Sequence, residues 1–136
     1  MHRHAVLYDR DCGFCRWSLG LILRWDRRRV LRPVALQDAD ADRLLAGMPQ
    51  EERMASWHLV ALGGEIRSAG AAAGPLLRLL SGGRPLAALL ERFPRATDRG
   101  YRWVADHRSL FGKLVAERSK ERADALILER TERWAL

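Results

Sequence analysis

The two cysteines of the chain, Cys12 and Cys15, are separated by two residues and follow a short apolar segment. Residues 5–8 have the composition of a strand, and the turn residues after them lead into a helical pattern that begins at about Cys12. The unpaired backbone N–H groups and the dipole of a helix N-terminus favour a thiolate over a thiol. The spacing and its context therefore indicate a redox-active dithiol/disulfide pair.

The two cysteines are expected to have different roles. Cys15 lies three residues after Cys12, which is nearly one helical turn, so the two sulfurs can approach to disulfide distance. At the helix N-terminus, Cys12 is expected to be the exposed nucleophile. Cys15 is then the buried cysteine that resolves a mixed disulfide.

Neighbouring residues would tune this pair. Arg16 is close enough in sequence to favour the thiolate, whereas Asp9 and Asp11 would oppose it by like-charge repulsion. Gly13 and Phe14, which lie between the cysteines, would adjust the redox potential of the couple. The residues around the motif therefore form the expected site.

Two other uses of the cysteines remain open. A structural zinc site normally needs four ligands, but the chain has no second cysteine pair and its histidines lack the short spacing of a zinc finger. Ligands shared across a dimer would allow zinc, or an iron–sulfur cluster bridged between two chains. The cysteines could also be small hydrophobic residues of the core. The histidines are His2, His4, His58 and His107.

The length of 136 residues and the hydrophobic content of 48% predict one domain with a substantial core. Two cysteines are too few for a disulfide-rich secreted scaffold, and no segment has the pattern of a signal peptide or a membrane helix. These features predict a cytoplasmic protein that does not enter a membrane. Because that compartment is reducing, catalysis or sensing is the expected use of a thiol pair, and the motif needs no prosthetic group.

The net charge of +7 comes almost entirely from arginine, because Lys113 and Lys120 are the only lysines. A basic chain raises the question of nucleic acid binding. The one dense cluster, at residues 24–32, lies where the first helix should end, and cations there complement the helix dipole without any partner. Aromatic interleaving of the kind that stacks bases is absent around this cluster. We therefore expect no nucleic acid partner.

The first half of the chain predicts a strand–helix–strand unit. Residues 12–28 carry a broad apolar face that suits a helix packed on a sheet. Residues 29–37 are short and β-leaning, and Pro33 predicts an edge strand or a bulge there. This order implies a right-handed crossover and a parallel pair, with the cysteines at the carboxyl end of the first strand.

The middle of the chain predicts short helices and a hairpin. Asp38, Asp40 and Asp42 are expected to be charges at a helix start rather than a metal site, because the glycine and glutamate of a calcium loop are missing. A second turn is expected near residues 49–52. Residues 57–68 predict two strands around Gly63 and Gly64, so the second half of the sheet is antiparallel.

The remainder of the chain predicts helices over residues 70–80, 85–92, 97–107 and 111–134, separated by glycine and proline. The last of these carries a partial apolar stripe that could dock on the domain or on a second copy of the chain. We expect a single domain over residues 1–136, with its core at about 4–108 and a helical extension at about 109–136.

This α/β order of elements resembles a thioredoxin-like fold, with a central mixed four-stranded sheet flanked by helices and with extra C-terminal helices. More narrowly, residues 7–15 (Leu-Tyr-Asp-Arg-Asp-Cys-Gly-Phe-Cys) resemble the opening motif of the DCC family of predicted thiol-disulfide oxidoreductases. Residues 66–73 and 101–108 continue the similarity. The resemblance implies that Cys12 and Cys15 are the redox pair, that Asp9 is the motif's aspartate, and that the partners are protein or small-molecule thiols and disulfides.

Two positions depart from these patterns. Arg10 stands where the family usually has a glycine, so a guanidinium lies beside the site and positive φ is disfavoured. Thioredoxin-like proteins usually have a cis-proline just before the third strand, whereas residues 54–57 contain no proline. Trp57 in this segment, like Trp17, could border a substrate groove. His58 is expected to be a structural residue of the strand rather than a base.

Together these features predict a thiol-disulfide oxidoreductase. The Cys12 thiolate attacks a substrate disulfide, a mixed disulfide forms, and Cys15 resolves it. The alternative is a non-enzymatic thioredoxin-like module whose thiols sense oxidation or hold an inter-chain iron–sulfur cluster. In that case the arginine-rich C-terminal helix would bind a partner.

Overall fold

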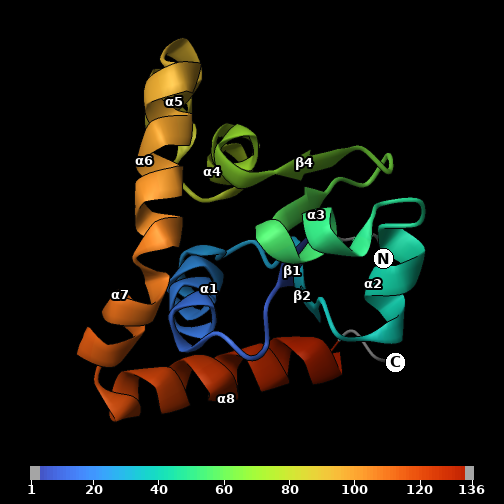
Figure 1. The fold of residues 1–136 in the computed structure, drawn as a ribbon, viewed down its shortest axis with the longest axis vertical. Coiled ribbons are helices and arrows are strands. Elements are labelled where there is room, and N and C mark those ends of the chain that lie inside the picture. Colours follow the sequence, from blue (N-terminus) through green and yellow to red (C-terminus); the bar gives the residue numbers. More distant parts are fainter. Residues whose placement is uncertain (1–3, 134–136) are drawn as a thin grey trace.

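The computed structural model describes residues 4–133, which form a mixed α/β arrangement around a four-stranded sheet (Figure 1). The strands are β1 (His4–Tyr8), β2 (Leu31–Ala35), β3 (His58–Val60) and β4 (Ile66–Ser68), in the spatial order β2-β1-β3-β4. β1 pairs with β2 in parallel, whereas β3 is antiparallel to both β1 and β4. The predicted mixed sheet is therefore confirmed.

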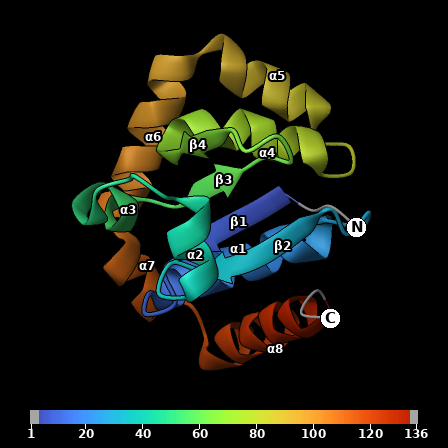
Figure 2. The same ribbon diagram turned by 90° about the vertical axis from the view of Figure 1, so that its right-hand side faces the viewer.

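Eight α-helices surround the sheet within the described residues. They are α1 (Gly13–Trp25), α2 (Ala39–Leu44), α3 (Gln50–Ala55), α4 (Ala73–Leu79), α5 (Arg84–Arg92), α6 (Pro94–Asp106), α7 (Arg108–Leu114) and α8 (Glu117–Arg133), with a 3₁₀ helix at Ala69–Ala72. The α-helix predicted from residue 70 thus begins at residue 73. α5, α6 and α7 follow one another along one side of the molecule, and α8 runs below α1 (Figures 1 and 2).

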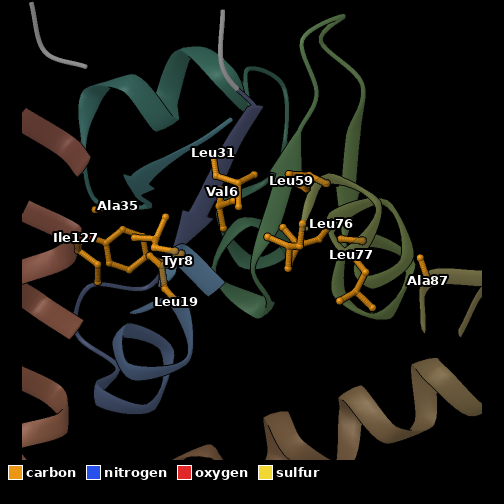
Figure 3. Packing of buried hydrophobic residues seen from close by; sticks show 13 residues of the cluster. Val6, Tyr8, Leu19, Leu31, Ala35, Leu59, Leu76, Leu77, Ala87 and Ile127 are labelled. Atoms are coloured by element: carbon orange, nitrogen blue, oxygen red, sulfur yellow. The ribbon is translucent and has the colours of Figure 1, made fainter. Parts of the chain in front are cut away.

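The central strand β1 is buried on both faces, because its side chains alternate between two hydrophobic clusters. Val6 and Tyr8 belong to a cluster that also contains Leu19 of α1 and residues of α4, α5 and α8 (Figure 3). Ala5 and Leu7 belong to the second cluster, which α2 covers. Full burial of a Val or Leu side chain contributes about 1.5–3 kcal/mol. The loop that leads to Cys12 therefore follows a strand that is firmly packed.

Two predictions about the sheet are confirmed. Pro33 lies in β2, an edge strand whose single neighbour in the sheet is β1. The hairpin between β3 and β4 turns at residues 61–64, where the Gly64 N–H donates to the carbonyl of Ala61 at 2.9 Å. Gly64 has a φ of +88°, which a residue with a side chain rarely adopts.

Helix ends differ from prediction where side chains or proline geometry decide the boundary. α1 ends just before Asp26 rather than near residue 28, because the fully buried Asp26 carboxylate accepts the N–H groups of Val30 at 3.1 Å and Leu31 at 3.0 Å. α6 begins at Pro94 rather than at Thr97, since proline suits the first turn of a helix. The Thr97 hydroxyl instead donates to the carbonyls of Phe93, just before α6, and of Leu90 in α5.

The prediction of one helix over residues 111–134 is wrong. The chain is extended at Val115, with φ −78° and ψ 130°, and this break separates α7 from α8. The break lets Phe111 pack against Phe14 of α1, with ring centroids 5.6 Å apart, while α8 turns back to bury Ala123 and Ile127. A single straight helix could not make both contacts. The end expected at residue 134 lies outside the described residues.

α8 packs on α1 of the same chain, which is one of the two kinds of docking expected for its apolar stripe. The backbones of α1 and α8 approach closely, because a Cβ added at Gly20 would lie 2.5 Å from the Cβ of Ala123. Further along the same contact, Arg130 donates to the carbonyl of Leu23 at 3.0 Å and lies 3.6 Å from Asp26 (Nη1–Oδ2). The C-terminal helix therefore supports α1 along most of its length.

Candidate active site

The loop after β1 places Cys12 at the N-cap of α1, as the sequence predicts. The backbone of Cys12 is extended, with φ −99° and ψ 110°, and its Sγ accepts the N–H of Cys15 at 3.3 Å. The Cys12 carbonyl accepts the N–H of Arg16 at 3.1 Å, as the first regular bond of the helix. The first turn of α1 contains no acidic residue that would compete for its N–H groups.

The two sulfurs form an asymmetric pair. The Sγ atoms lie 2.6 Å apart, with the Cys15 thiol donating to Cys12. This hydrogen bond is the main reason that the pKa of Cys12 is lowered to about 6, because it stabilises the thiolate more than burial disfavours it. The same contact, together with burial, raises the pKa of Cys15 far above its ordinary range. Near neutral pH, Cys12 is therefore ionised while Cys15 keeps its proton.

The cation that acts on this pair is Arg108, at the start of α7. Its charge lowers the pKa of Cys12, whereas the carboxylate of Asp9 raises it. Arg16, the cation expected from sequence proximity, instead lies 3.4 Å from Asp124 of α8 (Nε–Oδ1). The positive charge that favours the Cys12 thiolate thus comes from the start of α7 and not from the neighbouring residue of α1.

The turn at residues 9–11 is held by Gln37, two residues after β2. The Gln37 amide donates to Asp9 Oδ1 at 2.8 Å and to Asp11 Oδ2 at 3.4 Å, and its Oε1 accepts the N–H of Arg10 at 3.2 Å. The Arg10 guanidinium forms an ion pair with Asp38, at 3.0 Å between Nη1 and Oδ1. The residue that replaces the usual glycine is therefore engaged by the start of α2.

A cavity of about 230 Å³ lies on the Cys15 side of the pair, between α1, α6 and the segment before β3. Its walls include Trp57, which the sequence singles out, and Ser56 from the same proline-free segment. Tyr101 of α6 also lines it; burial raises the pKa of Tyr101, while polar contacts with Trp57 and Ser56 act in the opposite direction. Among residues 4–133 no peptide bond is cis.

A second cleft, of about 550 Å³, opens on the Cys12 side between the starts of α1, α7 and α8. Phe14 and Arg108 line both this cleft and the first cavity. Lys120 of α8 reaches over the start of α1, with its Cε 3.4 Å from where a Cβ at Gly13 would be. Both residues between the cysteines therefore lie beside the C-terminal helices, Gly13 next to α8 and Phe14 next to α7. The charged lining residues are Asp11, Arg108, Lys113, Glu117 and Lys120.

His58 is a buried residue of β3, only 1% exposed. Its Nδ1 lies 2.5 Å from the Ser68 hydroxyl, and its Nε2 lies 2.8 Å from the carbonyl of Arg53. Burial lowers the pKa of His58 and favours the neutral ring. The imidazole thus joins two strands and a helix end, which is the structural role expected for it.

The tryptophans of α1 contact other parts of the fold, although Trp25 is exposed. Trp17 contacts Phe14, with ring centroids 5.8 Å apart, and does not line the cavity beside Cys15. The indole of Trp25 donates to the carbonyl of Ser81 at 2.7 Å. Of the two tryptophans that the sequence suggests could border a groove, Trp17 and Trp57, Trp57 is the one at the cavity.

Among residues 4–131, whose side chains the structure describes, no three His, Cys, Asp or Glu side chains are arranged to hold a metal ion. Asp38 is the N-cap of α2, and Asp40 and Asp42 lie in its first turn, as expected for helix-start charges. His2 lies outside the described residues. In the part of the chain that the structure describes, none of the helices is long and apolar enough to cross a bilayer.

The family model of the DCC1-like thiol-disulfide oxidoreductases matches residues 6–113, which include both cysteines and most of the sheet. The chain belongs to this family. No curated protein and no solved structure matches it. The match to the DCC1-like family ends within α7, so α8 lies outside it.

Two residues of this DCC1-like site were not expected from the sequence. Arg108 ends the segment at residues 101–108, whose resemblance to the family singles it out without indicating a role. Nothing in the sequence next to Gln37 indicates a role at the site, because the segment of α1 separates it from its three partners at residues 9–11. Both are found only when β2 and α7 are placed beside the loop after β1.

Proposed function

We propose that this protein is a thiol-disulfide oxidoreductase with a thioredoxin-like fold, in which Cys12 is the nucleophile and Cys15 resolves. The Cys12 thiolate forms a bond to one sulfur of a substrate disulfide, and the other sulfur leaves as a thiolate that takes a proton from water. The Cys15 sulfur then bonds to Cys12 Sγ, and its proton passes to the departing substrate thiol. Two electrons thus move from the dithiol to the substrate, without a prosthetic group.

The observation that carries this proposal is the hydrogen bond from the Cys15 thiol to the Cys12 sulfur at the N-terminus of α1. It supports a nucleophile that is ionised near neutral pH, with its resolving partner already within reach. Membership of the DCC1-like family supports the same reaction class. The sheet order β2-β1-β3-β4, with the cysteines after β1, supports the thioredoxin-like fold.

We also infer that residues 1–136 form a single domain. The inference is supported by the packing of α8 on α1, because Ala123 and Ile127 of the C-terminal extension are buried there. The extension would then be part of the enzyme's folded body.

The test is a thiol titration of the native protein across a glutathione redox series, beside the variants Cys12→Ser and Cys15→Ser. A reversible two-electron couple, lost in both variants, is expected for the native protein. Cys15→Ser should accumulate a mixed disulfide at Cys12, identified by mass spectrometry after digestion. Two thiols that stay unreactive across the series would refute the proposal.

A further inference from the structure

The cleft on the Cys12 side contains more cations than carboxylates. It is lined by the cations Arg108, Lys113 and Lys120 and by two carboxylates. Lys120 lies 3.2 Å from Glu117 (Nζ–Oε1), which neutralises one cation. Neither Arg108 nor Lys113 forms an ion pair with any side chain that the structure describes. Two cations are therefore available to a ligand that reaches Cys12.

The surroundings of these cations strengthen the attraction. Arg108 is half-buried, so water screens its charge less than that of an exposed side chain. The N-terminus of α1 opens at the same place, and its dipole also favours negative charge. The cleft volume of about 550 Å³ falls within the range of about 300–1,000 Å³ that small-molecule sites occupy.

We propose that this cleft binds the carboxylate of a low-molecular-mass thiol or disulfide whose sulfur exchanges with Cys12. Arg108 and Lys113 are the binding residues, with Arg108 nearest to the reacting sulfur and Lys113 further along α7. The inference rests on the proposed function, since it names the substrate class of the same site. It selects anionic small molecules over neutral or cationic ones of equal size.

The test compares three symmetric disulfides of similar length: dithiodipropionate with two carboxylates, bis(hydroxyethyl) disulfide without charge, and cystamine with two ammonium groups. The reduced protein is mixed with each, and the rate of oxidation of the Cys12–Cys15 pair is followed. Each rate is divided by that of a free cysteine peptide with the same disulfide. The ratio of anionic to neutral rates then removes effects on the reactivity of Cys12 itself, to which Arg108 also contributes.

We expect the native protein to prefer dithiodipropionate over the neutral disulfide by about tenfold, with cystamine slowest. Lys113→Gln, an exposed change, should reduce that preference about two- to fivefold, the effect of one exposed ion pair. Arg108→Gln should reduce it by about tenfold, because its charge is half-buried. The matched control is Arg95→Gln, which should leave the preference unchanged. Arg95 lies at the start of α6, whereas Arg108 follows the end of that helix.

The two proposals fail in different ways. If none of the three disulfides oxidises the pair, the proposed oxidoreductase function is wrong. If all three react at equal normalised rates, or cystamine reacts fastest, the function stands and the carboxylate site is refuted. A preference that persists unchanged in both Lys113→Gln and Arg108→Gln would also refute it.

Discussion

Replacing Cys15 by alanine tests the origin of the thiolate at Cys12. The pKa of Cys12 is about 6, whereas an ordinary cysteine titrates near 8.5. Since one pKa unit corresponds to about 1.4 kcal/mol, the site favours the thiolate by about 3 kcal/mol. The hydrogen bond from the Cys15 thiol is the largest contribution, and alanine removes it while keeping the backbone N–H of residue 15.

We therefore expect Cys15→Ala to raise the pKa of Cys12 by about 1–2 units, as expected for loss of a hydrogen bond to a charged group worth about 1.5–3 kcal/mol. Cys15→Ser retains a donor, so its Cys12 should titrate between the native and alanine values. Arg108→Gln removes a smaller contribution and should raise the pKa less than alanine does. The assay is the rate of alkylation as a function of pH, checked against the ultraviolet absorbance of the thiolate.

The order of the Cys12 pKa values in the three variants shows which contact contributes most to stabilising the thiolate. If Cys15→Ala leaves the pKa of Cys12 near its native value, the contact between the sulfurs is not what stabilises the thiolate. If Arg108→Gln has the larger effect, the charge at the start of α7 is dominant and the asymmetry of the pair has another cause. Circular dichroism of each variant confirms that the fold is retained.

The stability of the fold gives three more predictions. For reduced protein between pH 6 and 8.5, the unfolded chain binds more protons at Cys12 than the folded one, so the free energy of unfolding should rise with pH by up to about 3 kcal/mol relative to Cys12→Ser, in denaturant titrations. Gln37→Leu removes the hydrogen bonds that hold residues 9–11 and should lower the stability by about 1 kcal/mol, with faster amide exchange in that turn. Gly20→Ala should destabilise by about 1–3 kcal/mol, because its Cβ meets α8. Gly100→Ala, in an open position of α6, should stabilise by up to about 1 kcal/mol in thermal melts; equal effects at the two glycines would contradict the close packing of α1 and α8.

The features that could be predicted from the sequence are those encoded over a few neighbouring residues. The N-cap position of Cys12 follows from a strand, a turn and a helical pattern that are adjacent in the chain. The hairpin follows from Gly63 and Gly64 between two β-rich segments, and the edge position of β2 follows from Pro33. Each of these features depends on local backbone geometry, and the type of residue at a position directly limits the backbone conformations that it can adopt.

The features that could not be predicted depend on contacts between distant segments. The break at Val115 has no glycine or proline, and it is explained by the separate contacts of α7 and α8 with α1. Arg16 was expected to act on the cysteines because it is near them in sequence, but Asp124 of α8 engages it. Arg108 acts instead, and its proximity requires α6 to carry the chain back to the site.

The properties of Cys12 thus depend on more than the C-x-x-C motif. α8 lies outside the part of the chain that matches the family, yet it lies against α1 along most of that helix: Lys120 lies over Gly13, and Ala123 lies against Gly20. Near the end of α1, Arg130 bonds to its backbone. The backbone N–H and the thiol of Cys15 act on Cys12 only while the first turn of α1 is intact. A helix that stabilises α1 therefore also stabilises the Cys12 thiolate. The same helix lines part of the cleft on the Cys12 side. We therefore expect the C-terminal extension to affect both the stability of the site and the binding of the proposed anionic substrate.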